Sequence, residues 1–521
     1  MEEYKYEPLN LDCAAIRLLR LHHGLRGPIS CELFQAELHR RENTVAYEAL
    51  SYAWGSPNRT GSIIVNGCHM TVTFNLHQAL LHLRQEDEDR VLWVDAVCID
   101  QANNKEKGHQ VAQMGGIYKE ADRVIFRLGR GSYETDTFMD SLQLLQQASV
   151  KLGCRDWSRQ DVRWENIWAR SQSKVYYSGL ENMQRRGLEE ILTRPWFRRV
   201  WILQEVAFAR AGIVSCGRKA VSASLFSLAP LLLRVTPDAH CQSVIDLMPS
   251  QWRETSRWSR SQTLHVLLIE FGGSDATDPR DLVYALRAMS ADLRDTTTLM
   301  PDYGKCEQDL VRDVYLYIYS YEPEFLEWRK RPRSMRELVA SLRELHGKNL
   351  VPTLLKIPPM CKDLQKIIKG RAFFVDQGTL RSAAQYDRNG ELVELLLRYR
   401  GGELTVDSEA IICATKNSSV PAEILEIFFR FNTQPILIVT EKMLLAAAKN
   451  SRSSDMAMDF LLSQKTEDYN NIAAIVDAIL RNPCNDTEEE TIRILLHYNN
   501  QGYPANCGSV SERRRHSETV V

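Results

Sequence analysis

This 521-residue sequence has almost no net charge and no long apolar run. Its 65 Lys and Arg residues balance 67 Asp and Glu residues, so no global field draws it to nucleic acid or an anionic membrane. The longest apolar stretch, residues 221–233, is shorter than the roughly 20 residues that cross a bilayer. The start, MEEYKYEPLN, has no signal-peptide pattern. We therefore expect no membrane span and no nucleic-acid partner.

Motifs for common chemistries are also absent. The twelve cysteines form no CxxC pair, which is typical of reduced thiols in a cytosolic protein, and the histidines show no metal-ligand spacing. The sequence has no G-x-x-x-x-G-K-[ST] loop, no H-E-x-x-H and no G-x-S-x-G, and Gly129-Arg130-Gly131 lacks the third glycine of a dinucleotide fingerprint. We expect a cytoplasmic protein with no metal site and no permanently bound cofactor.

The region from about residue 47 to residue 217 alternates apolar runs with helical patterns. Strands are predicted over residues 50–54, 63–65, 70–73, 91–94, 124–126 and 213–215. Asn66-Gly67 predicts a hairpin turn, and Asn75 is the expected cap of the next helix. Between the fourth and fifth strands, Val111, Met114 and Ile117 recur at helical spacing. A strand–helix–strand unit of this kind predicts an α/β domain with a mainly parallel sheet.

Three details of this region concern helices. Gly115-Gly116 conflicts with helix propensity and indicates close packing. A helix is predicted over 195–209 with Pro195 in its first turn, and residues 133–190 are expected to form a helical insertion. Residues 218–345 are mostly helical by pattern, and residues 278–281 are expected to open a helix that carries Leu282, Ala285 and Leu286, with Asp278 as its cap.

The C-terminal region repeats. The blocks VELLL, LEIFF, MDFLL and IRILL end at Leu397, Phe429, Leu462 and Leu496, which are 32, 33 and 34 residues apart. Small residues in ATKN and AAKN precede two of them, and this period predicts stacked helix pairs. The pattern is similar to degenerate ankyrin repeats, and other helical repeats remain open. The expected segments are a lead-in (1–46), an α/β domain (47–217), a helical flank (218–345), α-solenoid-like repeats (375–500) and a flexible tail (501–521).

Three strings are specific when taken together. They are YEALSYAWG (47–55), LWVDAVCIDQANNKEKGHQVAQMGGIYKEADRVIFRLG (92–129) and RPWFRRVWILQEVAFA (194–209). This set closely resembles the heterokaryon incompatibility (HET) domain of filamentous fungi, and DPRDLVYAL (278–286) with PDY (301–303) resembles the segment that commonly follows it. The resemblance implies a role in non-self recognition, in which such domains trigger cell death after fusion of unlike hyphae.

HET domains are thought to be distant relatives of TIR domains, so the resemblance also implies a TIR- or flavodoxin-like fold. Some TIR domains hydrolyse NAD+ with a Glu on a helix bearing a Trp-Cys-x-x-Glu-like motif. Here Trp201 precedes Glu205 by four residues, which places both on one helical face and makes Glu205 the candidate catalytic residue. A carboxylate stabilises the oxocarbenium-like state of nicotinamide–ribose cleavage. The alternative is that Glu205 forms an ion pair with Arg198, Arg199 or Arg210.

The remaining candidates are ligand-binding residues. Asp95 and Asp100 follow a predicted strand at its carboxyl end, where open α/β sheets bind ligands, and each either orients a ribose or caps a helix. Trp54, beside Gly55, either stacks on a base or packs in the core. Arg198, with Arg194 and Arg199, either holds a pyrophosphate or is solvated, and Glu106 either serves the pocket or complements a helix dipole.

Two functions follow from the resemblance. The first is a cell-death effector that uses NAD+ as substrate, with C-terminal repeats that bind a protein partner or drive self-association. The second is a non-enzymatic signalling module whose α/β domain oligomerises and recruits other proteins.

Overall fold

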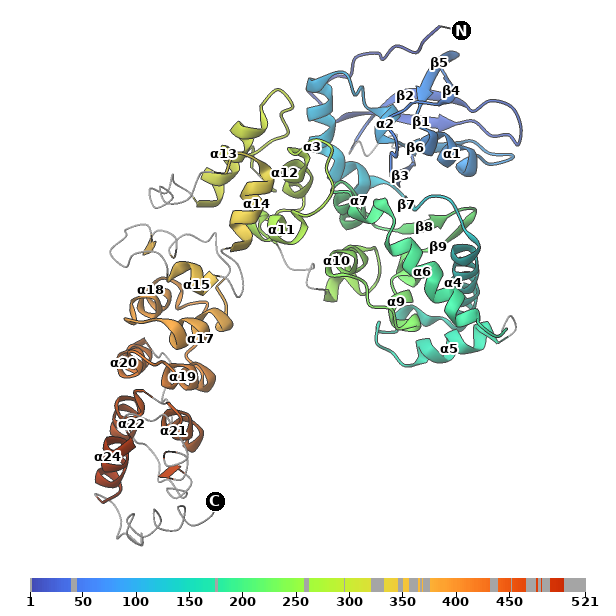
Figure 1. The fold of residues 1–521 in the computed structure, drawn as a ribbon. Helices are drawn as coiled ribbons and strands as arrows, with labels where there is room; N and C mark the ends of the chain where they lie inside the picture. The colour runs from blue at the N-terminus through green and yellow to red at the C-terminus, as the bar shows by residue number, and fades with distance from the viewer. Residues whose placement is uncertain are drawn as a thin grey trace. The chain divides into compact units, whose positions relative to one another are not determined.

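The computed structural model describes most of the chain in two compact units. The described residues are 2–38, 45–173, 177–256, 262–294, 296–319, 332–344, 350–355, 364–365, 368, 375–431, 439–450, 452–464, 475–476, 479 and 488–500. One unit comprises Met1–Ile318 and Pro332–Val339, and the other comprises Tyr319–Arg331 and Ala340–Val521. The first contains a β-sheet flanked by helices, and the described part of the second is helical (Figure 1).

The sheet has nine strands in the described residues, in the order β5-β4-β2-β1-β6-β3-β7-β8-β9. The strands are β1 (Ala15–Leu21), β2 (Ser30–Glu37), β3 (Glu48–Tyr52), β4 (Gly61–Val65), β5 (Cys68–Val72), β6 (Arg90–Trp93), β7 (Arg123–Arg127), β8 (Gly212–Cys216) and β9 (Lys219–Ser222). Four neighbouring pairs are parallel and four are antiparallel within this described sheet.

The sheet is therefore mixed, and the prediction of a mainly parallel sheet is wrong. Only the run β6-β3-β7-β8 is parallel throughout. The difference arises because residues 1–46, treated above as a lead-in, supply β1 and β2, and β1 runs antiparallel to both β2 and β6. Glu48 of β3 forms ion pairs with Arg90 of β6 and Arg123 of β7, which ties the three central strands together at their amino ends.

Helices connect and cover the strands. Those up to residue 344 are α1 (Phe74–Leu83), α2 (Asp95–Cys98), α3 (Asn104–Glu120), α4 (Tyr133–Leu152), α5 (Arg163–Gln172), α6 (Leu180–Leu192), α7 (Ile202–Phe208), α8 (Ala223–Phe226), α9 (Ala229–Leu233), α10 (Ala239–Leu247), α11 (Leu264–Phe271), α12 (Asp281–Arg287), α13 (Glu307–Tyr319) and α14 (Met335–Glu344), with 3-10 turns η1 (Cys154–Asp156), η2 (Pro195–Arg198) and η3 (Arg253–Thr255). Helix α3 buries Val111, Met114 and Ile117, the residues whose spacing predicts it.

Gly115 has a packing reason. A Cβ atom at Gly115 would lie 3.0 Å from the Phe208 ring of α7, so the glycine lets α3 and α7 approach closely. This contact explains one of the two glycines that conflict with the helix propensity of α3.

Three predicted helix starts are wrong. Helix α1 is capped by Thr73, whose side chain accepts from the Leu76 N–H, while Asn75 donates to the Ala53 carbonyl. The predicted helix over 195–209 is split into η2 and α7, because the backbone between them pairs with Asp275 as an isolated β-bridge. Helix α12 begins at Asp281, and Asp278 instead forms an ion pair with Arg280.

The second unit contains helices that pair along the chain. They are α15 (Leu350–Leu354), α17 (Gln377–Tyr386), α18 (Glu391–Arg400), α19 (Ser408–Thr415), α20 (Pro421–Phe431), α21 (Glu441–Ala448), α22 (Ser454–Ser463) and α24 (Glu488–Asn500). From α17 to α20, each helix packs against the helix two places further along, so α17 contacts α19 and α18 contacts α20. The identification of these pairs as ankyrin-like stays a prediction, and the tail over 501–521 lies outside the described residues.

Two buried asparagines join successive helix pairs in this unit. The Asn417 Nδ2 atom donates to the Ala384 and Asp387 carbonyls at 3.0 and 2.6 Å. The Asn450 Nδ2 atom makes the same kind of bonds to the Thr415 and Asn417 carbonyls at 2.9 and 2.7 Å. Both residues end the ATKN and AAKN strings, so a sequence period of 33 residues recurs as a repeated hydrogen-bonding arrangement.

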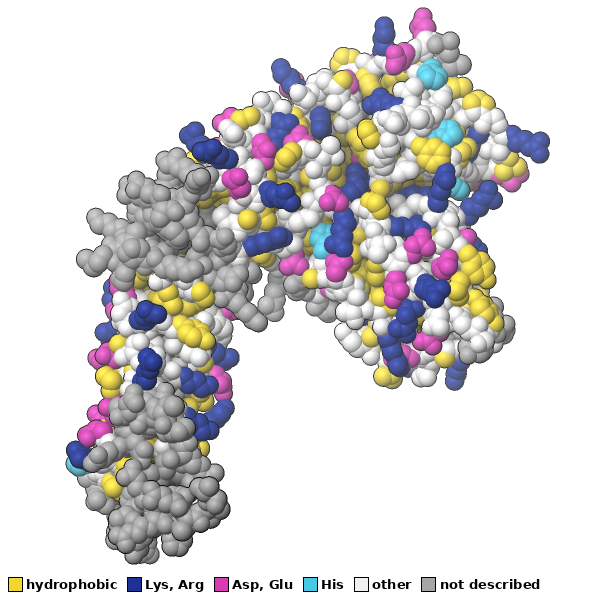
Figure 2. All heavy atoms as spheres, in the orientation of Figure 1, with side chains coloured by type: hydrophobic (Ala, Val, Ile, Leu, Met, Phe, Trp, Pro, Cys, Tyr) yellow, Lys and Arg dark blue, Asp and Glu magenta, His cyan; other side chains and the backbone are white. Residues whose placement is uncertain are grey.

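The described surface mixes charges of both signs. On the face shown in Figure 2, basic and acidic side chains are interspersed, as the balanced composition predicts. Within the described residues, no helix combines the length and apolar character that crossing a bilayer requires.

Candidate functional site

A cavity of about 1120 Å³ lies at the carboxyl ends of the central parallel strands. Tyr52 ends β3, Arg127 ends β7, and Asp95 follows β6, and all three line the cavity. Open α/β sheets bind ligands at this edge, because side chains and loops from neighbouring strands converge there. The wall also includes residues from three later segments: Glu190, Arg194, Pro195, Trp196, Arg199, Trp201, Asp275, Ala276, Thr277, Asp278 and Asp281.

Asp95 is a carboxylate on this wall whose two oxygens each accept a hydrogen bond. Its Oδ2 atom accepts from Trp54 Nε1 at 2.8 Å, and its Oδ1 atom accepts from the Ala96 N–H at 2.7 Å. Burial raises the pKa of Asp95, while the Arg199 guanidinium and these two bonds oppose the rise. The carboxylate is therefore fixed in position by groups that do not neutralise it.

Arg199 lies beside this carboxylate. Its Nη1 atom donates to the Tyr52 carbonyl at the end of β3, and its positive charge lowers the pKa of both Asp95 and Glu205. Arg199 forms no ion pair at bonding distance with a described residue. Its positive charge therefore stabilises the ionised forms of Asp95 and Glu205 from a distance.

Glu205 lies behind the wall and not on it. Its side chain is buried, at 1% exposure, and it is not among the residues that line the cavity. Burial raises the pKa of Glu205 to about 7; Arg199 and hydrogen bonds from Ser51 and Tyr118 lower it, whereas Asp95 raises it. Its Oε2 atom has no hydrogen-bond partner among the residues that the structure describes. Of the three predicted partners, Arg198 pairs instead with Asp238 and Arg210 donates to the Glu120 carbonyl, whereas Arg199 acts on Glu205 through its charge, without an ion pair at bonding distance among the described residues.

A second acidic cluster comes from the segment that follows the three motifs. Asp281 Oδ2 accepts from Trp201 Nε1 at 3.1 Å, and Asp281 Oδ1 accepts from the Tyr303 hydroxyl at 2.8 Å. The Lys107 ammonium lies over the Tyr303 ring, 3.9 Å from its centroid. Burial raises the pKa of Asp281, and Lys107 opposes the rise. The DPRDLVYAL string therefore adds Asp278 and Asp281 to the wall, and Tyr303 of the PDY string holds Asp281 in place.

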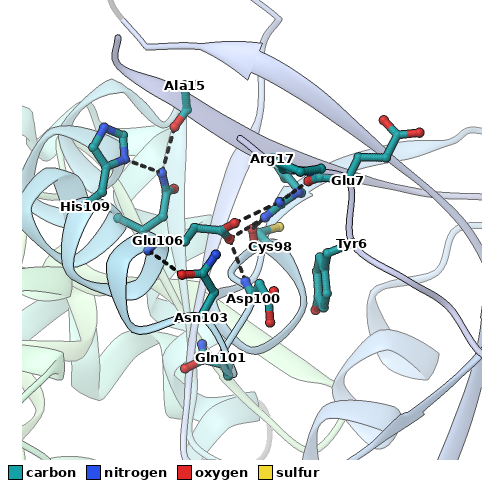
Figure 3. Close-up of polar contacts among 12 residues, drawn as sticks. Tyr6, Glu7, Ala15, Arg17, Cys98, Asp100, Gln101, Asn103, Glu106 and His109 are labelled. Carbon is teal, nitrogen blue, oxygen red and sulfur yellow. Dashed lines mark hydrogen bonds and ion pairs between the residues drawn. The ribbon is translucent and has the colours of Figure 1, made fainter. Parts of the chain in front are cut away.

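The loop after β6 is held by a buried ion pair (Figure 3). Arg17 of β1 binds Glu106 of α3 through two nitrogens, at 2.6 and 3.0 Å, and both side chains are 2% exposed. Glu106 Oε1 also accepts from the Asp100 N–H at 2.7 Å. Glu106 does not line the cavity; it lies in the first turn of α3, as the helix-dipole alternative expects, and is in addition the buried partner of Arg17. The pair supports the turn from which Gln101 reaches back to the Asp95 carbonyl, at 2.9 Å.

The predicted ligand-binding residues divide into two groups. Trp54, Gly55, Asp95 and Trp201 line the cavity. Asp100 does not, because its carboxylate accepts from the Ala102 N–H in the loop beside Arg17 and Glu106. Arg198 does not either, since it forms a half-exposed ion pair with Asp238. Among the described residues, no group of three or more His, Cys, Asp or Glu side chains is arranged to hold a metal ion.

Sequence reasoning missed several wall residues. Lys107, Arg127 and Asp281 received no role, although each lies within or beside one of the quoted motifs. The sequence does contain a pointer to Asp281, because DPRDLVYAL follows the three strings and a segment that recurs beside a domain often completes its site. Only the fold shows that this segment returns to the carboxyl edge of the sheet.

These observations define an α/β domain with a ligand-sized cavity at its carboxyl edge. Residues 47–205 match the model of a family described as Heterokaryon incompatibility protein (HET). The chain is also similar to a Neurospora crassa protein named "Heterokaryon incompatibility protein 6, OR allele", with 29% identity over 339 residues, or 55% of this chain and 49% of the relative. The match thus covers about half the length of that relative, and no solved structure matches. The match over residues 47–205 confirms the resemblance to the HET domain, and the TIR-like character stays a prediction.

Proposed function

We propose that this chain acts in heterokaryon incompatibility, as an effector of the cell death that follows non-self recognition. The HET domain and the name of the Neurospora relative support this role. The proposed chemistry is hydrolysis of the nicotinamide–ribose bond of NAD+. The observation that carries it is the Asp95 carboxylate, fixed by Trp54 on the wall of a cavity large enough for a dinucleotide.

The reaction suits a wall carboxylate. In NAD+ hydrolysis the bond between ribose C1′ and the nicotinamide nitrogen breaks, and its electron pair leaves with neutral nicotinamide. Positive charge develops on the ribose, water then bonds to C1′, and one proton is released. A carboxylate in a site that excludes water stabilises that charge strongly. Asp95 meets this requirement because Trp54 and Ala96 hold it without neutralising it.

In this proposal Glu205 acts through Asp95 and does not contact the substrate. Its carboxylate lies behind the wall, and the negative charge of Asp95 raises the pKa of Glu205 while Arg199 lowers the pKa of both groups. A proton on Glu205 removes a negative charge beside Asp95 and so favours the ionised form of Asp95. Glu205 is thus the positioning residue that sets the charge of Asp95.

The test is an NAD+ turnover assay with the full chain at several protein concentrations, because TIR-like enzymes often act only when assembled. D95N is expected to lower the rate of nicotinamide release by at least about 100-fold, as loss of a stabilising group in a preorganised site does. E205Q is expected to retain turnover and to lose the pH dependence near 7, which a merely structural role would not produce. E181Q, on the exposed face of α6, is the matched control and keeps wild-type activity. Wild-type turnover by D95N would refute the proposal.

A specific observation favours the second candidate function, a non-enzymatic signalling module. The predicted catalytic residue, Glu205, is not on the cavity wall. In this alternative the HET domain self-associates, and the C-terminal helix pairs bind a protein partner. Expression in a filamentous fungus separates the two: growth arrest by D95N equal to that of wild type, with no NAD+ loss in either, supports the module.

A further inference from the structure

The opposite end of the same cavity is basic. Arg127 is the last residue of β7, Arg130 follows in the Gly129-Arg130-Gly131 loop, and Arg194 precedes η2. All three line the cavity. The carboxylates at the other end come from different segments, after β6 and at the start of α12. Arg199 and Lys107 stand beside those carboxylates, and Glu190 stands beside Arg194, so the charges of Arg127 and Arg130 are the ones to account for at the β7 end.

Arg127 is a buried cation without a buried anion. Arg127 is 5% exposed, and its guanidinium donates to the Gly217 carbonyl and, at 3.1 Å, to Ser215 Oγ. Its third neighbour, His82 Nδ1, lies 3.0 Å from Nη2, and burial together with Arg127 lowers the pKa of His82, so this neighbour is neutral. Among the described residues, no carboxylate forms an ion pair with Arg127. A buried charge in this state is unfavourable unless a counter-charge binds.

The other two arginines differ in how far they are neutralised. Arg194 pairs with Glu190 at 2.7 Å and donates to the Leu128 carbonyl at 3.0 Å. Arg130 is exposed, lies over the Phe74 ring 4.6 Å from its centroid, and forms no ion pair with a described residue. Asp136, at the start of α4, pairs with neither Arg127 nor Arg130. Two positive charges thus remain unmatched at this end of the cavity.

The loop between these arginines leaves room for a ligand. Gly129 has a φ of +110°, and a Cβ atom there would lie 3.6 Å from Arg194 Nη1. Any other residue at Gly129 would be strained, and its side chain would start in the space in front of the Arg194 guanidinium. The glycine therefore keeps the approach to the basic end open.

We propose that Arg127 and Arg130, supported by Arg194, form a subsite for the phosphate or pyrophosphate group of a nucleotide ligand. This inference rests on the proposed function in taking the same cavity as the ligand site, and it assigns the ligand's anionic part to the β7 end and its sugar to the Asp95 end. Guanidinium groups bind phosphate oxygens through charge-assisted hydrogen bonds. Of the three arginines that the sequence offers for a pyrophosphate, Arg194 and Arg199 line the cavity, whereas Arg198 is outside it and pairs with Asp238.

The test is isothermal titration calorimetry of the full chain with inorganic pyrophosphate, ADP and adenosine. Wild type is expected to bind pyrophosphate and ADP, and adenosine more weakly. R127Q and R130Q are each expected to weaken ADP binding by about tenfold, the usual effect of losing one charge-assisted bond. R185Q removes a surface arginine that pairs with Glu181 on α6, and it is expected to bind as wild type does.

Two results would overturn the inference. One is unchanged pyrophosphate and ADP binding in R130Q, whose exposed side chain can be replaced even if R127Q fails to fold. The other is equal binding of ADP and adenosine by wild type, which would place recognition on the base alone. The proposed function is tested by a different result. If ADP binding depends on Arg127 and Arg130 but NAD+ is not cleaved, the phosphate subsite is supported and the NAD+ hydrolase activity is refuted.

Discussion

The buried carboxylate of Glu205 makes the stability of the first unit depend on pH. Burial raises its pKa from 4.5 to about 7, so between these values the native state holds a proton that the unfolded state has released. The free energy of unfolding then falls as pH rises through this window, because ionisation is easier in the unfolded chain. Replacement of Glu205 by Gln removes this titration and keeps the side-chain volume.

The size of the effect follows from the pKa values. At about 1.4 kcal/mol for each pH unit, a rise from 4.5 to about 7 corresponds to about 3 kcal/mol. Asp95 and Asp281, whose pKa values are also raised, contribute with the same sign in both proteins. We therefore expect the stability of E205Q relative to wild type to increase by about 3 kcal/mol between pH 4.5 and pH 8.

Urea unfolding of the full chain, followed by tryptophan fluorescence across that pH range, measures this difference. Every tryptophan except Trp328 lies in the first unit, so the signal reports the unit that contains Glu205. E181Q serves again as the matched control, since its carboxylate is exposed on α6. Parallel pH profiles for E205Q and wild type would refute the reasoning, because they would mean that Glu205 is not proton-linked to folding.

Two further predictions concern buried polar groups. R17M leaves the Glu106 charge buried and without its Arg17 partner, so we expect the first unit to lose about 3–5 kcal/mol of stability in the same urea assay. Changing Glu106 to Gln as well is expected to restore part of that loss. A loss under about 1 kcal/mol, which is the size of a surface ion pair, would contradict this reasoning. N417A leaves two buried carbonyls without donors, and we expect about 2–4 kcal/mol less protection of α17 and α19 amides in hydrogen exchange. The exposed N389A is the control, and equal protection in both variants would count against the bridging role.

Local patterns predicted the central part of the fold. The runs that became β3, β6 and β7 are short and apolar, and the spacing of Val111, Met114 and Ile117 matches the buried face of α3. These signals are readable because each depends on residues close together in the chain. The first strand, β1, was missed because Arg17 interrupts its apolar run, and the partner that makes this arginine tolerable, Glu106, is 89 residues away.

The candidate site was predicted less completely, for the same physical reason. Asp95, Trp54 and Trp201 could be named because each follows a recognisable strand or lies in a motif, and the structure places them on one cavity. The exclusion of Glu205 from the wall could not be foreseen, since it depends on the extended residues that split η2 from α7 and on their bridge to Asp275. Long-range pairing of this kind leaves no period in the sequence.

The cavity wall is built from two stretches of the chain that are far apart in sequence. One side is encoded within residues 47–205, and the other, which includes Asp278 and Asp281, lies more than seventy residues further along the chain. Substitutions in that distant stretch change the shape of the cavity while the three strings between residues 47 and 209 stay intact. Two chains that look alike through their shared strings can consequently admit different molecules, and their selectivity has to be compared over both stretches at once.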